Sequence, residues 1–399
     1  MDKIRIGTRG SKLALRQAAL VQEALVRACG GVVTELVILR TRGDRIQDRP
    51  LSALGDKGVF ASELEQALLA GQIDLAVHSA KDLPMRLAEG LAIAAVLPRA
   101  DVRDALVVPK GGRVPVLRQN LYEERELVRV EDTEKKDRTE SRAGREACRG
   151  CEGRQAEEST ARAMPGDSSQ IFRLGTGSRR RQLLAGKIWG NVICEEIRGN
   201  VDTRLRKLQE GRYDGIILAK AGLDRLGIGS DREEAFDFYP LSPEVFLPAA
   251  CQGIIVVETV EGSLAAGICK EISDAETELC YAVEREALAQ LSADCSEAAA
   301  AWCRRVSPDQ EAYTVSASVQ DRPPVRQLSA WRPESAYAAL AYVPETACPE
   351  ERILLDVMYA DRRVSMTGPV SAVEGRRLAR WAAQEVKSQK EKAVCSQNQ

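Results

Sequence analysis

Aromatic side chains are scarce in this chain of 399 residues, and neither sign of charge is in clear excess. Phe, Trp and Tyr together make up 4% of the sequence, which argues against a platform that stacks nucleic-acid bases. The formal net charge is -2, so the general surplus of Lys and Arg that neutralises phosphates is also missing. We therefore expect no nucleic-acid partner, and any basic function has to be local.

Long apolar runs are missing as well. No stretch approaches the roughly 18–20 apolar residues that a spanning helix needs, and the first residues, MDKIRIGTRGSKLAL, turn polar where a signal peptide would be apolar. The expectation is a cytoplasmic monomer without a membrane partner. The eleven cysteines are odd in number and follow no repeating framework, so most are predicted to be reduced thiols.

Patterns typical of metal sites are equally sparse. His78 is the only histidine, and Cys148 and Cys151 have metal-ligand spacing but no second Cys or His pair. Because a zinc site normally takes four ligands, we interpret these two cysteines as exposed loop thiols and predict no metal site.

The chain does contain a repeated alternation of apolar strand patterns and helical patterns. Such repetition predicts mainly parallel sheets covered on both faces, whose ligands bind beyond the carboxyl ends of the strands. In the first hundred residues Ser11 is a predicted helix N-cap, and Ser62 and Glu65 have the spacing of a capping box. The predicted elements there are strands at 3–7, 32–39, 73–80 and 90–97 and helices at 11–28 and 61–71.

A second α/β unit is predicted from 104–108 and 171–227, separated by an insertion at about 120–169. That insertion is dense in Glu, Lys and Arg and shows no sustained period, so we expect it to be flexible. A helix at 274–294, strand patterns at 312–319, 325–331 and 352–360, and a closing helix at 371–389 with a frayed end predict a smaller α+β domain.

Basic residues gather just after predicted strands or in the first turn of the following helix, where backbone N–H groups also attract anions. Guanidinium groups bind carboxylates and phosphates bidentately, so the set predicts a cleft for such a ligand, with a solvated helix face as the alternative for any one arginine. The segment GTGSRRRQ lacks the Gly-Lys-Ser/Thr ending of a Walker motif, which argues against phosphoryl transfer.

The segment HSAKDLP, at 78–84, follows one of the apolar strands. We assign His78 to structure, because a histidine within an apolar strand is more often buried than catalytic. Lys81 is able to pair with a ligand carboxylate. Asp82 precedes Leu83 and Pro84, which hold the backbone extended, and a lone carboxylate among cations stays ionised and suits stabilisation of a developing positive charge.

At this point the motifs identify a family. The chain resembles the porphobilinogen deaminases, or hydroxymethylbilane synthases, in family order from Ile4 to about Cys295. The resemblance implies two doubly wound, periplasmic-binding-protein-like α/β lobes and a smaller α+β C-terminal domain, which places the lobes at 1–99 with 249–266 and at 103–242, and the last domain at 271–399. The matching segments are GTRGSKLALRQ, GDKGVF, HSAKDLP, GTGSRRRQ, IRGNVDTRL, AKAGLDRLG and LPAACQG.

The resemblance also implies an activity: a transferase that condenses four porphobilinogen molecules, releases ammonia, and yields the linear hydroxymethylbilane. It implies a dipyrromethane primer held by a cysteine thioether, which the helix register places at Cys295, with Cys303 as the close competitor. Asp82 aligns with the catalytic aspartate, and Lys57 and Phe60 fall in a segment like the family's active-site loop. The residues implied to contact the primer are Lys81, Ser11, Ser79, Thr176, Ser178, Arg180, Arg181 and Arg204, and those implied to bind substrate carboxylates are Arg9, Arg198 and Arg225.

The sequence departs from the family pattern at two cysteines. Around Cys295, Ala293 and Asp294 replace the usual glycines and Ser296 replaces the usual glutamine. Cys251 stands where the family usually has glycine, and a Cβ there is expected to strain the turn. Two alternatives to the enzyme therefore stay open at this point: a non-catalytic, two-lobed anion-binding protein, and a degenerate paralogue that has lost the primer.

Overall fold

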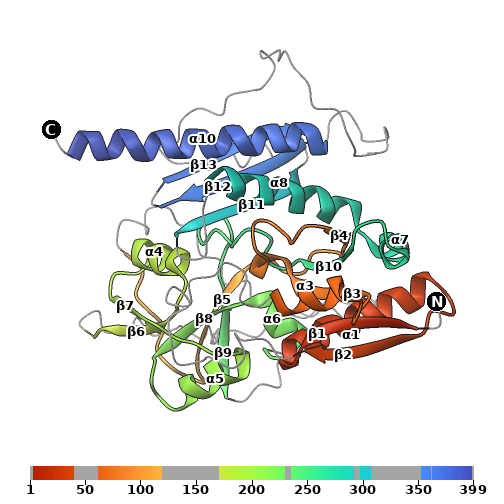
Figure 1. The fold of residues 1–399 in the computed structure, drawn as a ribbon. Coiled ribbons are helices and arrows are strands. Elements are labelled where there is room, and N and C mark those ends of the chain that lie inside the picture. The colour runs from red at the N-terminus through yellow and green to blue at the C-terminus, as the bar shows by residue number, and fades with distance from the viewer. Residues whose placement is uncertain are drawn as a thin grey trace, which may run out of the picture.

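Two mixed α/β sheets and one antiparallel sheet organise the computed structural model of the chain (Figure 1). The structure describes residues 3–39, 62–118, 170–229, 235–291, 297–306, 352–360 and 362–397. The expected fold class is confirmed, with two doubly wound lobes and a smaller α+β unit. The charged insertion with Cys148 and Cys151, the strand patterns at 312–319 and 325–331, and Lys57, Phe60 and Cys295 lie outside the described residues.

The sheet of the first lobe has the strand order β2-β1-β3-β10-β4. Strands β1, β2 and β3 run parallel, whereas β10 is antiparallel to both of its neighbours. Helices α1 and α7 pack on one face and α3 on the other, which makes the lobe doubly wound. The elements are β1 (Ile4–Arg9), α1 (Lys12–Ala28), β2 (Thr34–Leu39), α3 (Ser62–Leu69), β3 (Leu75–Ser79), β4 (Leu91–Val96), β10 (Ile255–Val260) and α7 (Leu264–Cys269).

The second lobe repeats this plan with the order β7-β6-β8-β5-β9. Here β5 is the antiparallel strand, paired with β8 and β9. In each lobe the antiparallel strand is the first strand after a chain crossing: β5 follows the crossing at 97–103, and β10 follows the crossing at 241–254. The elements are β5 (Asp104–Pro109), β6 (Phe172–Gly175), α4 (Arg179–Ile188), β7 (Val192–Glu195), α5 (Val201–Gln209), β8 (Gly215–Ala219), α6 (Lys220–Arg225) and β9 (Phe236–Pro240).

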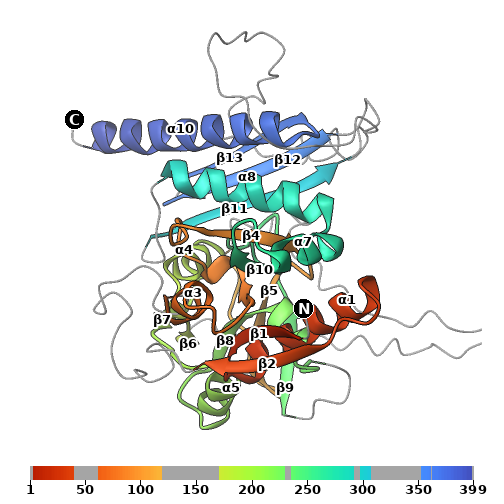
Figure 2. The ribbon, with the colours of Figure 1, turned by 45° about the vertical axis from the view of Figure 1, so that its right-hand side comes forward.

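The C-terminal unit lies across one end of both lobes in the two views (Figures 1 and 2). Alternate residues of its antiparallel sheet face different partners. Ala301 and Cys303 share an apolar cluster with the unit's helices and the first lobe, whereas Ala300 and Trp302 pack with the second lobe. Its elements are α8 (Ala275–Leu291), β11 (Ala299–Val306), β12 (Arg352–Tyr359), β13 (Arg362–Pro369) and α10 (Ala372–Gln397).

Of the predicted helix caps and element bounds, some are confirmed and others are wrong. Ser11 caps α1 as predicted, with its Oγ accepting a hydrogen bond from the Ala14 N–H at 3.2 Å. The capping box is wrong, because Ser62 Oγ donates to Glu63 and Glu65 accepts from the Ala88 N–H instead. The closing helix continues to Gln397 rather than fraying near 389, and β11 and β13 are strands that the sequence did not predict.

His78 is buried on β3, as expected for a structural histidine. Its Nε2 lies 3.0 Å from Oε2 of Glu258 on the neighbouring strand β10, and both side chains are buried. The pair joins strands 180 residues apart in sequence. A search of the helices within the described ranges finds none that is long and apolar enough to cross a membrane.

Candidate active site

Several of the predicted site residues lie at the carboxyl ends of parallel strands, where doubly wound sheets bind their ligands. In the first lobe, Arg9 ends β1 and Ser79 ends β3. In the second lobe, Thr176 follows β6 and Ser178 caps α4. The lobes meet beside these ends, where Lys12 Nζ lies 3.3 Å from the Asp202 carboxylate and a Cβ on Gly222 of α6 would touch Leu13.

Asp82 is presented on a short 3-10 turn, Ala80–Asp82, that directly follows β3. Ala80 is 0% exposed and Leu83 is 7% exposed, whereas Asp82 between them is exposed to solvent. The Ala80 N–H donates to the Ile254 carbonyl at 3.0 Å, which attaches the turn to the segment before β10. Buried neighbours on both sides therefore fix the turn while its carboxylate remains free to meet a ligand.

Lys81 lies on the same turn and points toward the second lobe's charged groups. Burial lowers the pKa of Lys81 to about 8, although the nearby carboxylates of Asp82 and Asp104 oppose that shift. Its Nζ lies 3.5 Å from Oε1 of Gln252, whose amide in turn donates to Asp104 Oδ1 at 3.1 Å. Lys81 is therefore a cation whose charge depends on pH near neutrality.

Asp104 is the buried centre of the cationic side of the site. Arg180 Nη2 donates to its Oδ2 at 2.8 Å, and Arg181 Nη2 donates to its Oδ1 at 2.7 Å. Burial opposes the charge on Asp104, but the two guanidiniums outweigh burial and hold the pKa of this carboxyl well below its ordinary value. Arg180 Nη1 donates to the Leu247 carbonyl at 2.6 Å, so both terminal nitrogens of Arg180 already have an acceptor within the protein.

Arg181 has one nitrogen, Nε, without a hydrogen-bond partner. Its Nη1 binds the Ile217 carbonyl and its Nη2 binds Asp104, but Nε is buried without a hydrogen-bond partner. Arg204 interacts electrostatically with both Arg181 and Asp82, and burial lowers the pKa of Arg204 to about 10. A buried N–H without an acceptor is costly, so the site is suited to an anionic ligand that would supply one.

The predicted hydroxyl contacts already have local roles. Ser178 Oγ caps α4 by accepting from the Arg181 N–H at 3.5 Å, and Thr176 Oγ1 accepts from the Ser178 N–H at 3.3 Å. Ser79 Oγ lies 2.8 Å from the Gln17 side-chain nitrogen. Local hydrogen bonds thus orient these three hydroxyls near the strand ends. The Ser11 hydroxyl is oriented in the same way, by the Ala14 N–H at the start of α1.

The three arginines expected to bind substrate carboxylates differ in their surroundings. Arg9 is partly buried at the end of β1. Arg198 donates from Nε to Glu196 Oε1 at 2.7 Å. Arg225 donates to the Gly253 carbonyl at 2.6 Å, and burial lowers the pKa of Arg225 to about 10. Arg225 therefore connects the second lobe to the crossing segment before β10.

Cys303, the competitor for the primer anchor, is unsuited to that role. Its side chain is 1% exposed and belongs to the apolar cluster under α8 and α10. A side-chain hydrogen bond with Cys280, together with burial, raises the pKa of the Cys303 thiol well above its ordinary value. Thioether formation requires an accessible thiolate, which this environment disfavours.

Comparison with known proteins decides the family. Residues 4–125 and 155–266 match the family described as "Porphobilinogen deaminase, dipyromethane cofactor binding domain". A porphobilinogen deaminase of Roseiflexus sp. (strain RS-1) is 37% identical over 291 residues, which are 73% of this chain and 78% of the relative. One from Nitrobacter hamburgensis is 37% identical over 302 residues, or 75% and 78% of the two chains. This chain belongs to the porphobilinogen deaminase family.

The predicted reaction class and cofactor are confirmed with it: the protein is a transferase, a hydroxymethylbilane synthase, and its cofactor is dipyrromethane. Solved structures give weaker likenesses. The periplasmic VFT2 domain of BvgS from Bordetella pertussis is 13% identical with a TM-score of 0.35, over 70% of this chain and 92% of that one. A zinc-bound ligand binding component of an ABC-type import system from Staphylococcus aureus is 12% identical with a TM-score of 0.32, over 72% and 73%.

The residues present fit a dipyrromethane, which carries carboxylate groups on two pyrrole rings. The unpartnered Nε of Arg181 and the Lys81 ammonium offer donors to carboxylates, and the exposed Asp82 offers an acceptor to pyrrole N–H groups. The deaminase thus has both charge signs that such a ligand requires.

Sequence reasoning missed two residues that build this site. Asp104 pairs with both arginines, and Gln252 links Asp104 to Lys81 and also donates to the Val102 carbonyl at 2.8 Å. Gln252 stands in the LPAACQG motif, so a signal was present, but Asp104 sits in an ordinary apolar strand pattern. Only the tertiary structure shows that its carboxylate meets Arg180 and Arg181.

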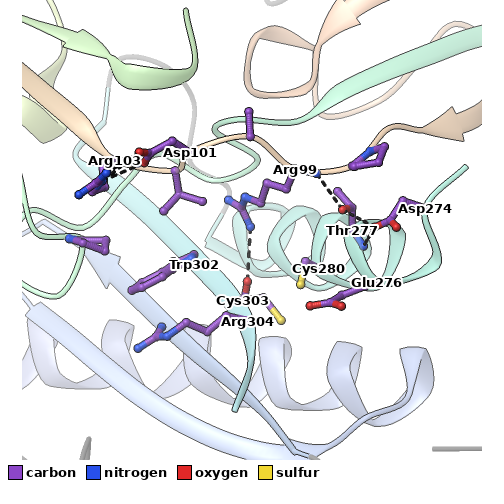
Figure 3. Close-up of a pocket in the computed structure, with 14 residues that line it drawn as sticks. Arg99, Asp101, Arg103, Asp274, Glu276, Thr277, Cys280, Trp302, Cys303 and Arg304 are labelled. Atoms are coloured by element: carbon purple, nitrogen blue, oxygen red, sulfur yellow. Dashed lines mark hydrogen bonds and ion pairs between the residues drawn. The ribbon is translucent and has the colours of Figure 1, made fainter. Parts of the chain in front are cut away.

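A separate hollow of about 590 Å³ lies between the crossing at 98–103 and the C-terminal unit (Figure 3). Arg304 stacks on Trp302 there, with its guanidinium carbon 3.5 Å from the ring centroid, and Cys280 and Cys303 lie side by side on one wall. Neither Lys81, Asp82 nor Arg181 lines this hollow. It is therefore distinct from the cleft at the strand ends.

Proposed function

We propose that the deaminase carries out its reaction at the strand ends between the two lobes, with Asp82 as its catalytic residue. The condensation of four porphobilinogen molecules into hydroxymethylbilane requires cations for the substrate carboxylates and an anion for the positive charge that develops. The observation that carries this proposal is the exposed Asp82 carboxylate, held on a buried turn and coupled electrostatically to Lys81 and Arg204.

The charges of the reacting species determine which residues the reaction requires. Loss of ammonia from porphobilinogen leaves a cationic azafulvene, which an ionised carboxylate stabilises. The same carboxylate accepts a hydrogen bond from a pyrrole N–H and assists proton transfer. Arg181, Arg204 and Lys81 bind the acetate and propionate groups, because fixed cations in a partly desolvated cleft attract carboxylates more strongly than in water.

We propose Cys295 as the anchor of the dipyrromethane. The exclusion of Cys303 by burial supports this choice, and α8 ends at Leu291, four positions before Cys295. When bound, the dipyrromethane supplies the pyrrole position to which the first substrate unit is joined. The remaining predicted contacts, from Ser11, Ser79, Thr176, Ser178, Arg9, Arg198, Arg225, Lys57 and Phe60, belong to this proposal. So does a cytoplasmic, monomeric state.

The test combines intact mass, peptide mapping and turnover of porphobilinogen. The wild-type protein is expected to carry added mass equal to two linked pyrrole units on the Cys295 peptide and to release hydroxymethylbilane. Asp82→Asn should keep the added mass, because Cys295 is unchanged, and lose between about 10²- and 10⁴-fold in kcat. Cys295→Ser should lose both the added mass and turnover.

Each contrary result points to a different error. Full turnover by Asp82→Asn would remove Asp82 from the chemistry. Added mass on another cysteine would move the anchor. Tight binding of porphobilinogen without any turnover or added mass would instead indicate the anion-binding alternative, which family membership does not favour.

A further inference from the structure

Arg285 of helix α8 reaches from the C-terminal unit to the catalytic turn. Its Nη1 donates to the Leu83 carbonyl at 3.3 Å, and its Nη2 donates to the Pro84 carbonyl. These two carbonyls belong to the first two residues after Asp82. One guanidinium of the C-terminal unit therefore holds the backbone that presents the catalytic carboxylate in the first lobe.

Apolar packing reinforces this link. Ala80 and Leu83, on either side of Asp82, belong to the same buried cluster as Val283 and Ala287 of α8. The N–H of Leu83 donates to the Ala80 carbonyl at 3.4 Å, a long hydrogen bond that leaves the turn weakly closed by its own backbone. Contacts with α8 thus contribute much of what fixes the direction of Asp82.

The guanidinium of Arg285 has no role in the charged cleft. Its side chain lines a hollow of about 300 Å³ together with Met85, Tyr281 and Arg376, and neither Lys81, Arg181 nor Arg204 lines that hollow. Within the described ranges, no carboxylate forms an ion pair with Arg285. Its described hydrogen bonds go to the catalytic turn, which distinguishes it from the arginines expected to bind carboxylates.

We propose that Arg285 is a positioning residue that fixes the direction of the Asp82 turn. Helix α8 also carries Val283 and Ala287, which share a buried cluster with Ala80 and Leu83, so one helix supplies both the hydrogen bonds and the apolar contacts that hold the turn. This proposal rests on the proposed role of Asp82. It explains why the family's catalytic aspartate is placed by a domain that supplies none of the charged cleft residues described above.

The test starts with Arg285→Gln in the primer-loaded protein. A misplacement of about 1 Å costs up to about 10²-fold in rate, so kcat should fall between about tenfold and a hundredfold while KM changes little. Arg285→Lys keeps one donor and should recover part of kcat. Arg380→Gln is the matched control, because Arg380 pairs at 3.7 Å with Glu286, the neighbour of Arg285 on α8. Within the described ranges Arg380 forms no hydrogen bond or ion pair with the turn.

A double-mutant cycle with Asp82→Glu separates positioning from general stability. If Arg285 acts through Asp82, then Arg285→Gln should reduce kcat much less in the Asp82→Glu background than in the wild type, because the carboxylate is already displaced. Equal losses in both backgrounds, or an unchanged kcat in a primer-loaded Arg285→Gln protein, would overturn the proposal.

Hydrogen exchange tests, without any activity measurement, whether Arg285 stabilises the turn. Peptides covering 80–85 should exchange faster in Arg285→Gln than in the wild type and in Arg380→Gln. Unchanged exchange there would also overturn the proposal. If the wild type itself fails to turn over porphobilinogen, the proposed function fails, and the exchange result alone still decides whether Arg285 orders the turn.

Discussion

Asp104 shows at the scale of one residue how a buried carboxylate organises a cationic site. It holds Arg180 and Arg181 side by side, two like charges that would otherwise repel, and accepts a further hydrogen bond from Gln252. Arg180 is thereby committed to the protein, while Arg181 keeps its Nε without a partner. Asp104 balances only one of the two guanidinium charges, so the cluster keeps a net positive charge and an Nε donor for an incoming carboxylate.

Asp104→Asn should destabilise the protein by about 3–5 kcal/mol, because it leaves two buried guanidiniums without a counter-charge. Since the pKa of Asp104 is depressed in the folded state, its contribution is present above the ordinary carboxyl pKa of about 4 and is lost as pH falls below it. Urea unfolding of wild type and variant should therefore show a constant difference above about pH 5 that shrinks in more acidic buffer.

Asp202→Asn provides the control for that measurement. Asp202 pairs with Lys12 across the lobes, but the two side chains are 44% and 74% exposed. Its loss should cost about 1 kcal/mol or less. A similar cost for both variants would mean that Asp104 does not hold a desolvated pair.

At the scale of an element, the turn at 249–253 combines two residues with positive φ in the crossing before β10. Cys251 has φ +60°, in the left-handed region that glycine adopts without cost and a residue with a Cβ adopts at a cost. The strain expected from its Cβ stays a prediction. Two residues later Gly253 has φ +88°, and a Cβ there would lie 2.5 Å from the Ala100 carbonyl oxygen. The turn therefore requires glycine at 253 and carries an unfavourable residue at 251.

Replacing Cys251 with glycine or with alanine should reveal this strain. Both changes remove the buried thiol, but only alanine retains a Cβ in the left-handed region, so Cys251→Gly should be more stable than Cys251→Ala by about 1 kcal/mol. At Cys269, buried in α7, the order should reverse, because glycine weakens a helix by about 1 kcal/mol relative to alanine. The same order at both positions, measured by urea unfolding, would contradict the argument.

At the scale of the whole molecule, Glu284 joins three parts of the chain at one buried carboxylate. Arg99 from the first crossing donates to it at 2.6 and 3.2 Å, and the backbone N–H groups of Cys251 and Cys303 donate at 2.5 and 2.8 Å. Arg99 also donates to the Cys303 carbonyl at 3.4 Å, a contact visible in Figure 3. Helix α8 thus contacts both crossings between the lobes as well as the turn that carries Asp82.

Glu284→Gln should lower the stability of the primer-loaded protein by about 3–5 kcal/mol, because Arg99 loses its buried counter-charge. Glu286, two residues along α8, pairs at 3.7 Å with a half-exposed Arg380 and accepts a hydrogen bond from Gln290 Nε2 at 2.9 Å. Glu286→Gln removes the charge but keeps an oxygen acceptor, so it should cost about 1 kcal/mol or less. Thermal unfolding of the two variants under one condition checks the difference. Equal shifts in Tm would show that the buried carboxylate does not hold the crossings.

The amino-acid sequence alone determined the two α/β units, the helix that Ser11 caps, and the position of Asp82 directly after an apolar strand. Those features depend on periodicity and on neighbours a few residues apart, which a sequence displays directly. Only the tertiary structure placed β10 antiparallel between β3 and β4, joined Asp104 to Arg180 across 76 residues, and buried Cys303 under α8. Such pairings depend on which distant segments of the chain meet. The residues next to an apolar strand or an arginine in the sequence do not indicate its partner in the fold.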